Sequence, residues 1–428
     1  MSLSDTMRGD RCHIAIFGRT NVGKSSLINA MTGQDLAMVS EIGGTTTDPV
    51  EKAMEILPLG PCLLIDTPGL DDESDLGEQR VKKSLQILPQ ADMALVVMDL
   101  SRESAECWEK MQEIPDQDLD ILVRIMGQGI SFVLVCTQTD RLSGKECAAR
   151  LERIRGLHPD WPVIGVSAHT GQGIRELREM LAAQMPRQEK DLHLLGDLVE
   201  PGDMVVLVTP VDRAAPKGRL IMPQQQTIRD LLDHGAVAVV TQVPALAQTL
   251  ERLRGQVKLV VTDSQAFGEV DRIVPEEIAL TSFSILFARK KGDLSQLSKD
   301  VSAVEQLRDG DRVLIAEGCS HHRTCDDIGT VKIPQMLREK TGRQLVIETC
   351  SGREFPEDLS PYRLVIHCGG CALTPRQMRA RMRKARLQGV PMVNYGIFIA
   401  YVKGILKRSM EVLQHNDDVD SEGHQKEF

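Results

Sequence analysis

The sequence feature that most constrains this chain is the run Gly18-Arg-Thr-Asn-Val-Gly23-Lys24-Ser25. It matches the phosphate-loop pattern G-x-x-x-x-G-K-[ST], and it follows an apolar segment that reads as a strand, as that loop requires. The glycines let backbone N–H groups wrap a β-phosphate, while Lys24 reaches the β and γ oxygens and Ser25 is placed to bind Mg²⁺. The pattern therefore predicts a nucleotide site. The candidate binding residues in the loop are Gly18, Asn21, Val22, Gly23, Lys24, Ser25 and Ser26.

Two further runs complete the predicted phosphate and magnesium site. Asp66-Thr67-Pro68-Gly69 follows the strand expected at Cys62–Ile65. An Asp at this point holds the Mg²⁺ shell, and the Gly69 N–H can sense the γ-phosphate. Gly44-Thr45-Thr46-Thr47-Asp48 lies between the two motifs, where a switch segment belongs, and Thr46 is the candidate for a second Mg²⁺ hydroxyl. The predicted catalytic residues are Lys24, Thr46, Asp66 and Gly69, with Thr45 as a further nucleotide contact.

The base-recognition segment departs from the pattern Asn-Lys-x-Asp. After the strand expected at Phe132–Cys136, the chain reads Thr137-Gln138-Thr139-Asp140. The Asp140 carboxylate can accept hydrogen bonds from N1–H and N2–H of guanine, whereas adenine presents an acceptor at N1. Ser167-Ala168 follows the next expected strand and fits the loop that backs the base. GTP is therefore the predicted nucleotide, without the contacts that Asn and Lys would add.

The alternation of apolar strands and helical patterns predicts an α/β protein of three domains. The first domain, at 1–188, is predicted to be a P-loop domain with a doubly wound parallel sheet. A polar stretch after Met185 reads as a linker. A small α/β module for packing or dimerisation is expected at 189–265, and a third α/β parallel-sheet domain at 266–428. The expected strands are 13–17, 62–65, 93–98, 132–136 and 163–166, then 204–208, 237–240 and 258–261, then 312–316, 344–348, 363–367 and 391–395.

Charge and hydropathy disfavour several classes of partner. Asp and Glu outnumber Lys and Arg by 61 to 51, and the net charge of -10 argues against a nucleic-acid coat, because phosphate binding needs a basic field. Aromatic residues make up only 3% of the chain, so base-stacking surfaces are not expected. No apolar run approaches the roughly 20 residues of a membrane helix, and the chain starts without an apolar signal region. We therefore expect a soluble, cytoplasmic protein.

Cysteine and histidine residues cluster in the C-terminal region. Cys319-Ser-His321 and His367-Cys368-Gly-Gly-Cys371 each follow an apolar strand, so both fall near carboxyl ends of strands, where open α/β sheets place ligand sites. Their convergence indicates a metal centre. Three Cys and one His would suit tetrahedral zinc, whereas three Cys with a weak or missing fourth ligand suit an iron–sulfur cluster. Isolated structural cysteines are the remaining alternative.

The GTPase motifs resemble those of the GTPases typified by Era and TrmE. Asn21 stands where potassium-activated members carry an asparagine that helps to ligate K⁺, and Leu70 stands where Ras-like enzymes carry the water-orienting glutamine. The resemblance implies Mg²⁺-dependent GTP hydrolysis in which K⁺ and the switch segment supply part of the charge stabilisation. A loop-stabilising side chain is the alternative role for Asn21.

Residues 8–413 as a whole resemble the [FeFe]-hydrogenase maturation GTPase family, HydF. That family combines a GTPase domain, a dimerisation domain and a cluster domain with the signature C-x-H…H-C-x-x-C. The resemblance implies a homodimer and a [4Fe-4S] cluster on Cys319, Cys368 and Cys371, in an iron–sulfur cluster-binding domain at 266–428. His321 or His367 could cap the fourth iron as a more easily displaced ligand. The resemblance also implies a scaffold for a di-iron subcluster precursor, with apo-[FeFe]-hydrogenase and radical-SAM maturation enzymes as partners.

Two other functions stay open on the sequence. One is a ribosome- or RNA-associated Era-like GTPase with a structural zinc site, which the acidic balance and the few aromatics disfavour. The other is a redox protein that nucleotide only regulates. The basic segment 376–386 reads as a solvated helix face, with a docking surface for an acidic partner or anionic cofactor as the alternative.

Overall fold

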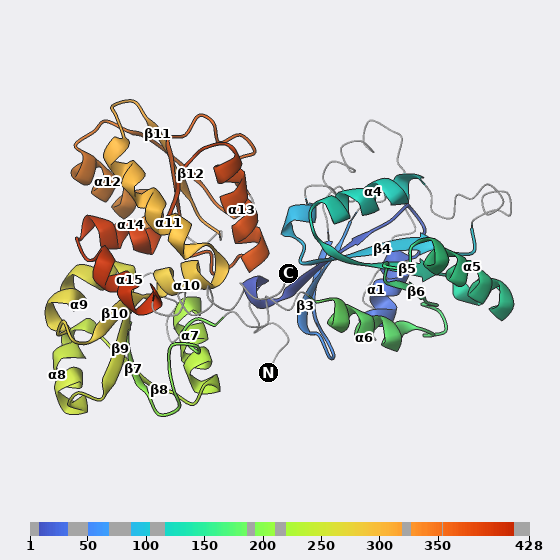
Figure 1. Ribbon diagram of the computed structural model, residues 1–428, viewed down its shortest axis with the longest axis horizontal. Helices are drawn as coiled ribbons and strands as arrows, with labels where there is room; N and C mark the ends of the chain where they lie inside the picture. Colours follow the sequence, from blue (N-terminus) through green and yellow to red (C-terminus); the bar gives the residue numbers. More distant parts are fainter. Residues whose placement is uncertain are drawn as a thin grey trace, which may run out of the picture. The chain divides into compact units, whose positions relative to one another are not determined.

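The computed structural model describes residues 8–32, 50–67, 87–102, 116–185, 193–209, 220–318, 327–352 and 354–414. Figure 1 draws them as ribbons coloured along the chain. They belong to two units, Met1–Lys190 and Asp191–Phe428, each built on its own sheets. In the described ranges, no helix is long and apolar enough to cross a membrane.

The first unit is a six-stranded sheet in the order β2-β3-β1-β4-β5-β6. Neighbouring strands run parallel except β2 and β3, which are antiparallel. β4 is buried at every position, as expected when helices cover both faces of a parallel sheet. The strands are β1 (Cys12–Phe17), β2 (Val50–Ile56), β3 (Gly60–Asp66), β4 (Met93–Asp99), β5 (Ser131–Thr137) and β6 (Val163–Gly165).

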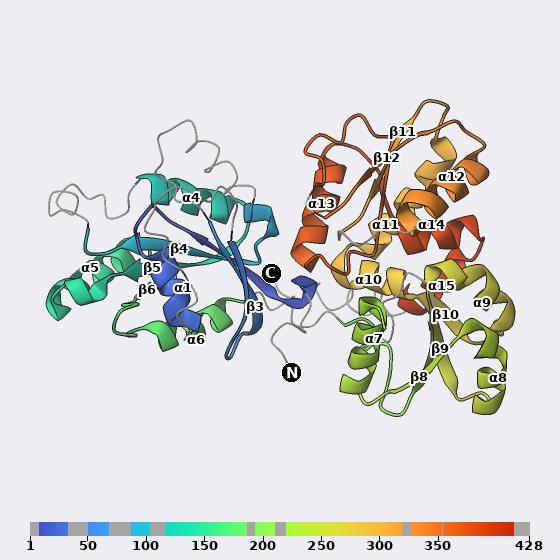
Figure 2. The same cartoon turned by 180° about the vertical axis from the view of Figure 1, so that it is seen from behind.

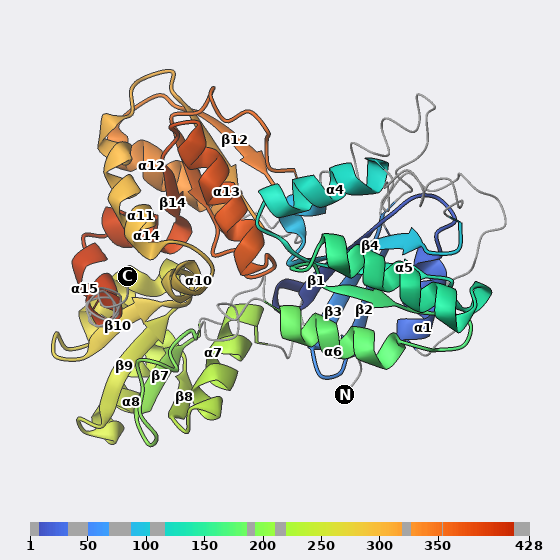
Figure 3. The same cartoon turned by 45° about the vertical axis from the view of Figure 1, so that its right-hand side comes forward.

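Helices cover both faces of this sheet (Figure 3). α4 and α5 contribute to one apolar core, and α1 and α6 contribute to the core on the opposite face. α5 begins where the sequence provides a capping box, in which Ser143 and Glu146 satisfy each other's backbone N–H groups. The helices are α1 (Lys24–Thr32), α4 (Asp116–Gly127), α5 (Gly144–Leu157) and α6 (Ile174–Gln184), with short 3-10 helices η1 (Arg8–Asp10), η2 (Leu88–Gln90) and η3 (Thr139–Arg141).

β1 lies at the point where the strand order reverses, because its neighbours are β3 on one side and β4 on the other. Open α/β sheets bind ligands outside the carboxyl ends of strands at such a point. The phosphate loop joins the carboxyl end of β1 to α1. The register pairs Ile16 with Asp66, so the loop and the Asp66 motif leave the sheet at the same edge.

The second unit contains two four-stranded sheets, in the orders β10-β9-β7-β8 and β12-β11-β13-β14. Every neighbouring pair in both sheets is parallel. The strands of the first are β7 (Met204–Val208), β8 (Val237–Thr241), β9 (Val257–Thr262) and β10 (Ala279–Ser282). Those of the second are β11 (Arg312–Ala316), β12 (Val346–Cys350), β13 (Leu364–His367) and β14 (Met392–Asn394).

Helices flank both sheets of the second unit. Figure 2 shows α8 and α9 on one side of the β7–β10 sheet and α7 on the other. The helices are α7 (Met222–Asp233), α8 (Val243–Leu253), α9 (Phe267–Ile273), α10 (Phe283–Lys291), α11 (Leu294–Asp300), α12 (Ile333–Thr341), α13 (Pro375–Leu387), α14 (Tyr395–Val402) and α15 (Leu406–Gln414). Short helices are η5 (Ser264–Ala266), η6 (Val301–Gln306) and the π-helix η7 (Ile328–Lys332).

One continuous apolar core joins the two sheets of the second unit. α10 contacts α7 and β10 of the first sheet as well as α13, α14 and β14 of the second. The last helix, α15, returns to pack against β10. Arg408 on α15 donates hydrogen bonds to Asp271 Oδ1 at 2.7 Å and to the Val274 carbonyl at 3.0 Å, which fixes α15 to the end of α9.

The α/β class and the parallel sheets of both units confirm the predicted fold class. The sequence did not predict β2 or β10. β2 has charged residues at three of its seven positions and lies at the edge of its sheet. β10 has only four residues. Because β10 pairs with β9, the second sheet extends past residue 265, where the sequence places a domain boundary.

Candidate functional sites

The phosphate loop approaches strand β4 closely. Gly18 has a backbone φ of 150°, and a Cβ at this residue would lie 2.3 Å from the Val97 carbonyl oxygen. Only glycine fits here without a shift of β4. The Lys24 ammonium donates hydrogen bonds to the carbonyl oxygens of Gly18 and Arg19, each at 2.8 Å. The glycine and lysine of the motif are therefore held in one tight turn.

Asn21 has the left-handed backbone conformation, with a φ of 62°. Asn tolerates this region better than most residues because its short polar side chain can hydrogen-bond locally. The turn thus accounts for an asparagine at this position through its backbone alone. A K⁺ ligand at Asn21 stays a prediction.

Ser25 and Asp66 meet where the sequence places magnesium. Ser25 Oγ lies 3.4 Å from Asp66 Oδ2, and Asp66 Oδ1 is buried with no hydrogen-bond partner among the described residues. Burial raises the pKa of Asp66, and the Lys24 charge opposes that rise. A hydroxyl and a carboxylate side by side are the hard oxygen donors that Mg²⁺ binds, and a cation there would also pair the orphaned oxygen. The residues present therefore fit Mg²⁺.

Thr137, at the Asn position of the base-recognition pattern, ties β5 to the phosphate loop. Its Oγ1 lies 2.6 Å from the Val22 carbonyl oxygen and 3.0 Å from the Met98 carbonyl oxygen. A hydroxyl has one hydrogen to donate, so the two acceptors share it. Thr137 is buried, so its hydroxyl makes these contacts away from solvent. The sequence did not predict this contact.

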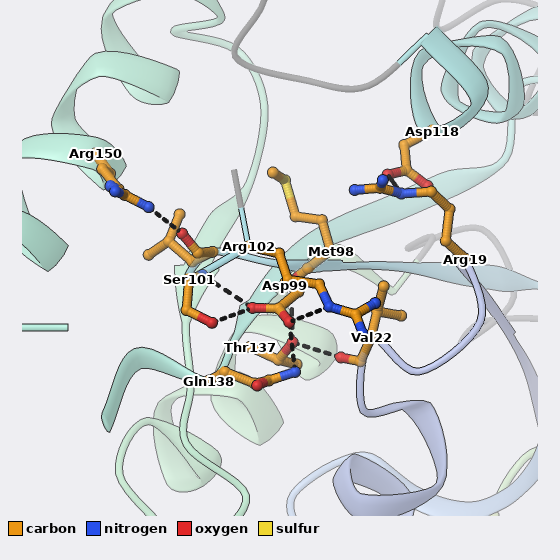
Figure 4. Close-up of polar contacts among 11 residues, drawn as sticks. Arg19, Val22, Met98, Asp99, Ser101, Arg102, Asp118, Thr137, Gln138 and Arg150 are labelled. Carbon is orange, nitrogen blue, oxygen red and sulfur yellow. Dashed lines mark hydrogen bonds and ion pairs between the residues drawn. The ribbon is translucent and has the colours of Figure 1, made fainter. Parts of the chain in front are cut away.

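Gln138, at the Lys position, turns toward a buried carboxylate (Figure 4). Its Nε2 donates to Asp99 Oδ2 at 2.6 Å, and its backbone is left-handed with a φ of 58°. Asp99 Oδ1 accepts from the Ser101 backbone N–H at 2.9 Å and from its hydroxyl at 2.7 Å. The Arg102 guanidinium lies 3.7 Å from Asp99 Oδ2. Gln138 thus belongs to a polar network at the carboxyl ends of β4 and β5.

A second contact that the sequence did not predict joins the phosphate loop to α4. Arg19 Nε donates to Asp118 Oδ2 at 3.2 Å, and the Asp118 side chain is fully buried (Figure 4). The sequence signal for Asp118 is weak, since an acidic residue near the start of a helix is common. Asp99 offered a better signal, because a carboxylate ended an otherwise apolar strand.

Asp140 lies on η3, beside the loop that follows β6. It is exposed, and the Ser167 hydroxyl lowers its pKa below the usual value, so the carboxylate is ionised at neutral pH. Ser167 is buried, and its Oγ also accepts from the Thr170 backbone N–H at 3.1 Å. Ser167 and Ala168 therefore stand next to the predicted base contact. Thr45, Thr46 and Gly69 lie outside the described residues.

In the second unit, Cys368 and Cys371 lie in the loop between β13 and α13. Cys368 Sγ accepts hydrogen bonds from the backbone N–H of Gly318 at 3.1 Å and from that of Gly370 at 3.3 Å. Burial and the neighbouring Cys371 raise the pKa of Cys368 to about 12. Two N–H donors directed at one sulfur suit a thiolate, which is the form in which cysteine binds a metal.

Cys319 and His321 lie outside the described residues, as does Cys325. The described segment 220–318 ends one residue before Cys319, at Gly318, whose N–H contacts Cys368. The parallel register of β11 and β13, which pairs Ala316 with His367, brings these two segments together although 50 residues separate Gly318 from Cys368.

A buried lysine supports the loop of Cys368 and Cys371 from within. Lys291, at the end of α10, is fully buried. Its Nζ donates to the carbonyl oxygens of Gly370 at 3.3 Å, Cys371 at 2.9 Å and Leu373 at 2.7 Å. An ammonium group has three N–H donors, so these three carbonyls match its capacity. No sequence signal singled out Lys291 from the other basic residues of α10.

His367 is buried, and both of its ring nitrogens have partners. Nδ1 lies 2.8 Å from the Cys368 carbonyl oxygen, and Nε2 lies 2.8 Å from an N–H group of Arg381. Burial and the Arg381 charge lower the pKa of His367 to about 3. Arg381 therefore points inward from α13, which differs from the solvated face expected for the whole segment 376–386. In this arrangement neither nitrogen of His367 is free to bind iron.

Three family models match the chain. The model for a 50S ribosome-binding GTPase matches residues 13–138. The model for the Hydrogen maturase F dimerization domain matches residues 194–292, and the model for the Hydrogen maturase F tetramerization domain matches residues 295–412. The last two matches follow each other along almost the whole described length of the second unit.

Individual relatives match a part of the chain. The mitochondrial 5-taurinomethyluridine-[tRNA] synthase subunit of Danio rerio is 35% identical over 184 residues, which are 42% of this chain and 36% of that protein. The tRNA modification GTPase MnmE of Aquifex aeolicus is 36% identical over 167 residues, which are 39% of this chain and 33% of that protein. The chain thus spans about a third of the length of these relatives.

Solved structures of GTP-binding proteins are also similar. A variant of Era from Aquifex aeolicus bound to GDP and AlF4⁻ has a TM-score of 0.35 and 21% identity, and the match covers 57% of this chain and 98% of that one. The G-domain of FeoB from Methanococcus jannaschii has a TM-score of 0.30 and 20% identity, and the match covers 41% of this chain and 98% of that one.

Replacing Thr137 by Val should loosen the phosphate loop, because the carbonyl oxygens of Val22 and Met98 lose their shared donor. We expect the free energy of unfolding of the first unit to fall by about 1–2 kcal/mol, and GTP affinity to fall about tenfold. Chemical denaturation and nucleotide titration measure the two effects. Thr139→Val is the matched control, because the buried Thr139 hydroxyl has no partner among the described residues and its loss should cost nothing. Equal losses in both variants would contradict the proposed tie.

Replacing Lys291 by Met should destabilise the cysteine loop, because three buried carbonyl oxygens lose their donor. We expect the free energy of unfolding of the second unit to fall by about 1–3 kcal/mol and the Cys371 thiol to react faster with a thiol reagent. The neighbouring Lys290→Met removes a charge from the same helix without touching these carbonyls. If Lys290→Met had the same effect as Lys291→Met, the loss would reflect α10 in general.

Proposed function

The chain belongs to the HydF family of GTPases, and from this premise we propose that it is a scaffold that binds a [4Fe-4S] cluster and assembles or delivers the di-iron subcluster precursor of [FeFe]-hydrogenase. The observation that carries the proposal is the pair of backbone N–H groups, from Gly318 and Gly370, that donate to Cys368 Sγ. N–H donors to sulfur are one of the means by which proteins tune iron–sulfur clusters.

The donor set of the second unit fits such a cluster. Cys368 and Cys371 lie on one loop, and the peptide bond joins Cys319 to Gly318, which already contacts Cys368. These three thiols would hold three irons, and the cluster would supply an open iron at which a second iron unit can be bridged and later released. Lys291 fixes the carbonyl side of the loop. The chain's own residues thus shape the loop before any metal binds.

His367 is proposed to position the loop rather than to ligate iron. Its Nδ1 is engaged by the Cys368 carbonyl and its Nε2 by Arg381, so a ligand role through Nε2 would require the contact with Arg381 to break. His321 stays the histidine candidate for the exchangeable position. A fourth ligand that leaves easily suits a carrier better than a closed site, because a structural site is closed by four firm ligands.

In the first unit, we propose that the chain hydrolyses GTP with Mg²⁺ and is faster in K⁺ than in Na⁺. Lys24 would neutralise charge on the β- and γ-phosphates, and Ser25 and Asp66 would hold Mg²⁺ directly and through water. Asp140, kept ionised beside Ser167, would accept the N1–H and N2–H of guanine. Asn21 is the proposed K⁺ ligand, and Thr46 and Gly69 are proposed to complete the phosphate site.

The proposed partners are apo-[FeFe]-hydrogenase and the radical-SAM maturation enzymes, together with a second copy of the chain. Support for a homodimer comes from β8, an edge strand of the β7–β10 sheet. Val237 and Val240 on β8 are each 44% exposed, and Leu232 at the end of α7 is 60% exposed. An exposed apolar edge strand is a ready surface for pairing with another chain.

The two activities should separate cleanly, because their residues lie in different units. Lys24→Ala should lower GTP hydrolysis at least about a hundredfold, because the charge on the β- and γ-phosphates loses its counterion. Bound iron and sulfide should stay unchanged, because the contacts of Lys24 with Gly18 and Arg19 lie within the first unit. Cys368→Ser should lose the iron and hydrogenase activation while GTP hydrolysis continues, because only a cluster ligand is lost. Anaerobic metal analysis and phosphate release in K⁺ and in Na⁺ measure both.

Cys147→Ser, which removes a partly exposed thiol from α5, is the control for the cysteine variant. Zinc in place of iron in the wild type, or full iron content in Cys368→Ser, would exclude the proposed cluster. Equal hydrolysis rates in K⁺ and Na⁺ would exclude the role of Asn21, and a preference for ATP would exclude that of Asp140.

The wild-type chain should have the mass of a dimer or of a multiple of it in light scattering. Val240→Lys should lower that mass by placing a charge on the β8 edge. Val346→Lys is the matched control, since Val346 is 47% exposed on β12, an edge strand of the other sheet. A monomeric wild type, or an unchanged mass for Val240→Lys, would contradict dimerisation through β8.

A further inference from the structure

Two histidines and an aspartate converge at the start of the second unit, in a cluster separate from the cysteine loop. His193 is the first described residue of this unit, while Asp230 lies on α7 and His234 caps the end of that helix. One ligand atom from each lies within 4.8 Å of those from the other two. The ring centroids of the histidines are 4.5 Å apart.

Asp230 is oriented by its second oxygen. Oδ2 accepts hydrogen bonds from the backbone N–H groups of Leu195 at 2.7 Å and Gly196 at 2.8 Å. Oδ1 lies 3.8 Å from His193 Nδ1. Two zinc ligands in a tetrahedral site lie about 3.4 Å apart, given metal–ligand bonds of about 2.0–2.1 Å. Oδ1 and the imidazole therefore need only a small movement to share one ion.

His234 is oriented by its own helix. Its Nδ1 lies 2.7 Å from the backbone carbonyl oxygen of Asp230, so Nδ1 carries the proton and donates it to this acceptor. The lone pair is then on Nε2, the nitrogen that would bind a metal. Metal-bound histidines commonly donate their other N–H to a carbonyl or carboxylate in this way.

Gly196 makes room for the His234 ring. A Cβ at this position would lie 2.2 Å from His234 Cε1 and within 2.5 Å of both ring nitrogens. The backbone of Gly196 therefore serves two purposes, because it binds the Asp230 carboxylate and leaves space for the imidazole. All three ligand candidates are only partly buried, so a metal ion can enter from solvent and keep water as a further ligand.

We propose that His193, Asp230 and His234 form a binding site for a divalent transition-metal ion such as Zn²⁺, through two imidazole nitrogens and one carboxylate oxygen. Imidazole and carboxylate donors suit zinc and its neighbours in the first transition row. The ion would link His193, near the start of the second unit, to the C-terminal end of α7.

The test uses the full chain with Cys368→Ser and Cys371→Ser, so that the thiols of the other site do not bind the probe. Equilibrium dialysis against buffered Zn²⁺ should find one bound ion per chain. His193→Asn and His234→Asn, each added to this background, should weaken binding at least about tenfold. Co²⁺ bound at the same site should give the spectrum of nitrogen and oxygen ligands, without thiolate charge transfer.

His169→Asn is the matched control, since His169 is an exposed histidine of the first unit. Its Zn²⁺ affinity should equal that of the background chain. Circular dichroism checks that each variant is folded, and His193→Asn, at the partly buried start of the unit, keeps the test valid if His234→Asn unfolds. No bound Zn²⁺ at micromolar concentration in the background chain, or affinity unchanged by both histidine variants, would overturn the site.

Discussion

Parallel strand pairing is the constraint on which the arrangement of both functional loops depends. In a parallel sheet all carboxyl ends meet at one edge, so residues far apart in sequence leave neighbouring strands together. In the first unit the pairing of Ile16 with Asp66 brings the phosphate loop and the magnesium aspartate to one edge. In the second unit the pairing of Ala316 with His367 brings Gly318 to the thiol of Cys368. A one-residue slip in either register would separate these groups.

Buried polar side chains fix the backbone of each of these two loops. Thr137 joins the phosphate loop to β5, and Lys291 gathers the carbonyl oxygens of the cysteine loop. Both side chains are buried, and each serves several backbone acceptors at once. Such groups are costly to leave unpaired in an apolar interior, so their hydrogen bonds help to hold both loops in place.

The sequence was informative where chemistry and periodicity coincide, and uninformative where a contact depends on tertiary structure. The phosphate loop was predictable because its glycines, lysine and serine follow a strand at fixed spacing. The contacts of the base-recognition segment could not be predicted in this way. The hydrogen bond from Gln138 to Asp99, for example, joins the ends of two different strands. Lys291 was indistinguishable from Lys290 in the sequence, and only burial separates them. The inward turn of Arg381 likewise depends on His367, which lies on another element.

The return of α15 to β10 has a consequence for how this architecture can be inherited. The helix lies in the segment matched by the tetramerization model, whereas the strand lies in the segment matched by the dimerization model. Each segment therefore completes the apolar core of the other. Arg408 on α15 adds a hydrogen bond to Asp271 on α9. A gene fusion that transferred residues 194–292 alone would carry an uncovered strand into its new host. The two segments match separate family models, but each needs the other to complete its fold.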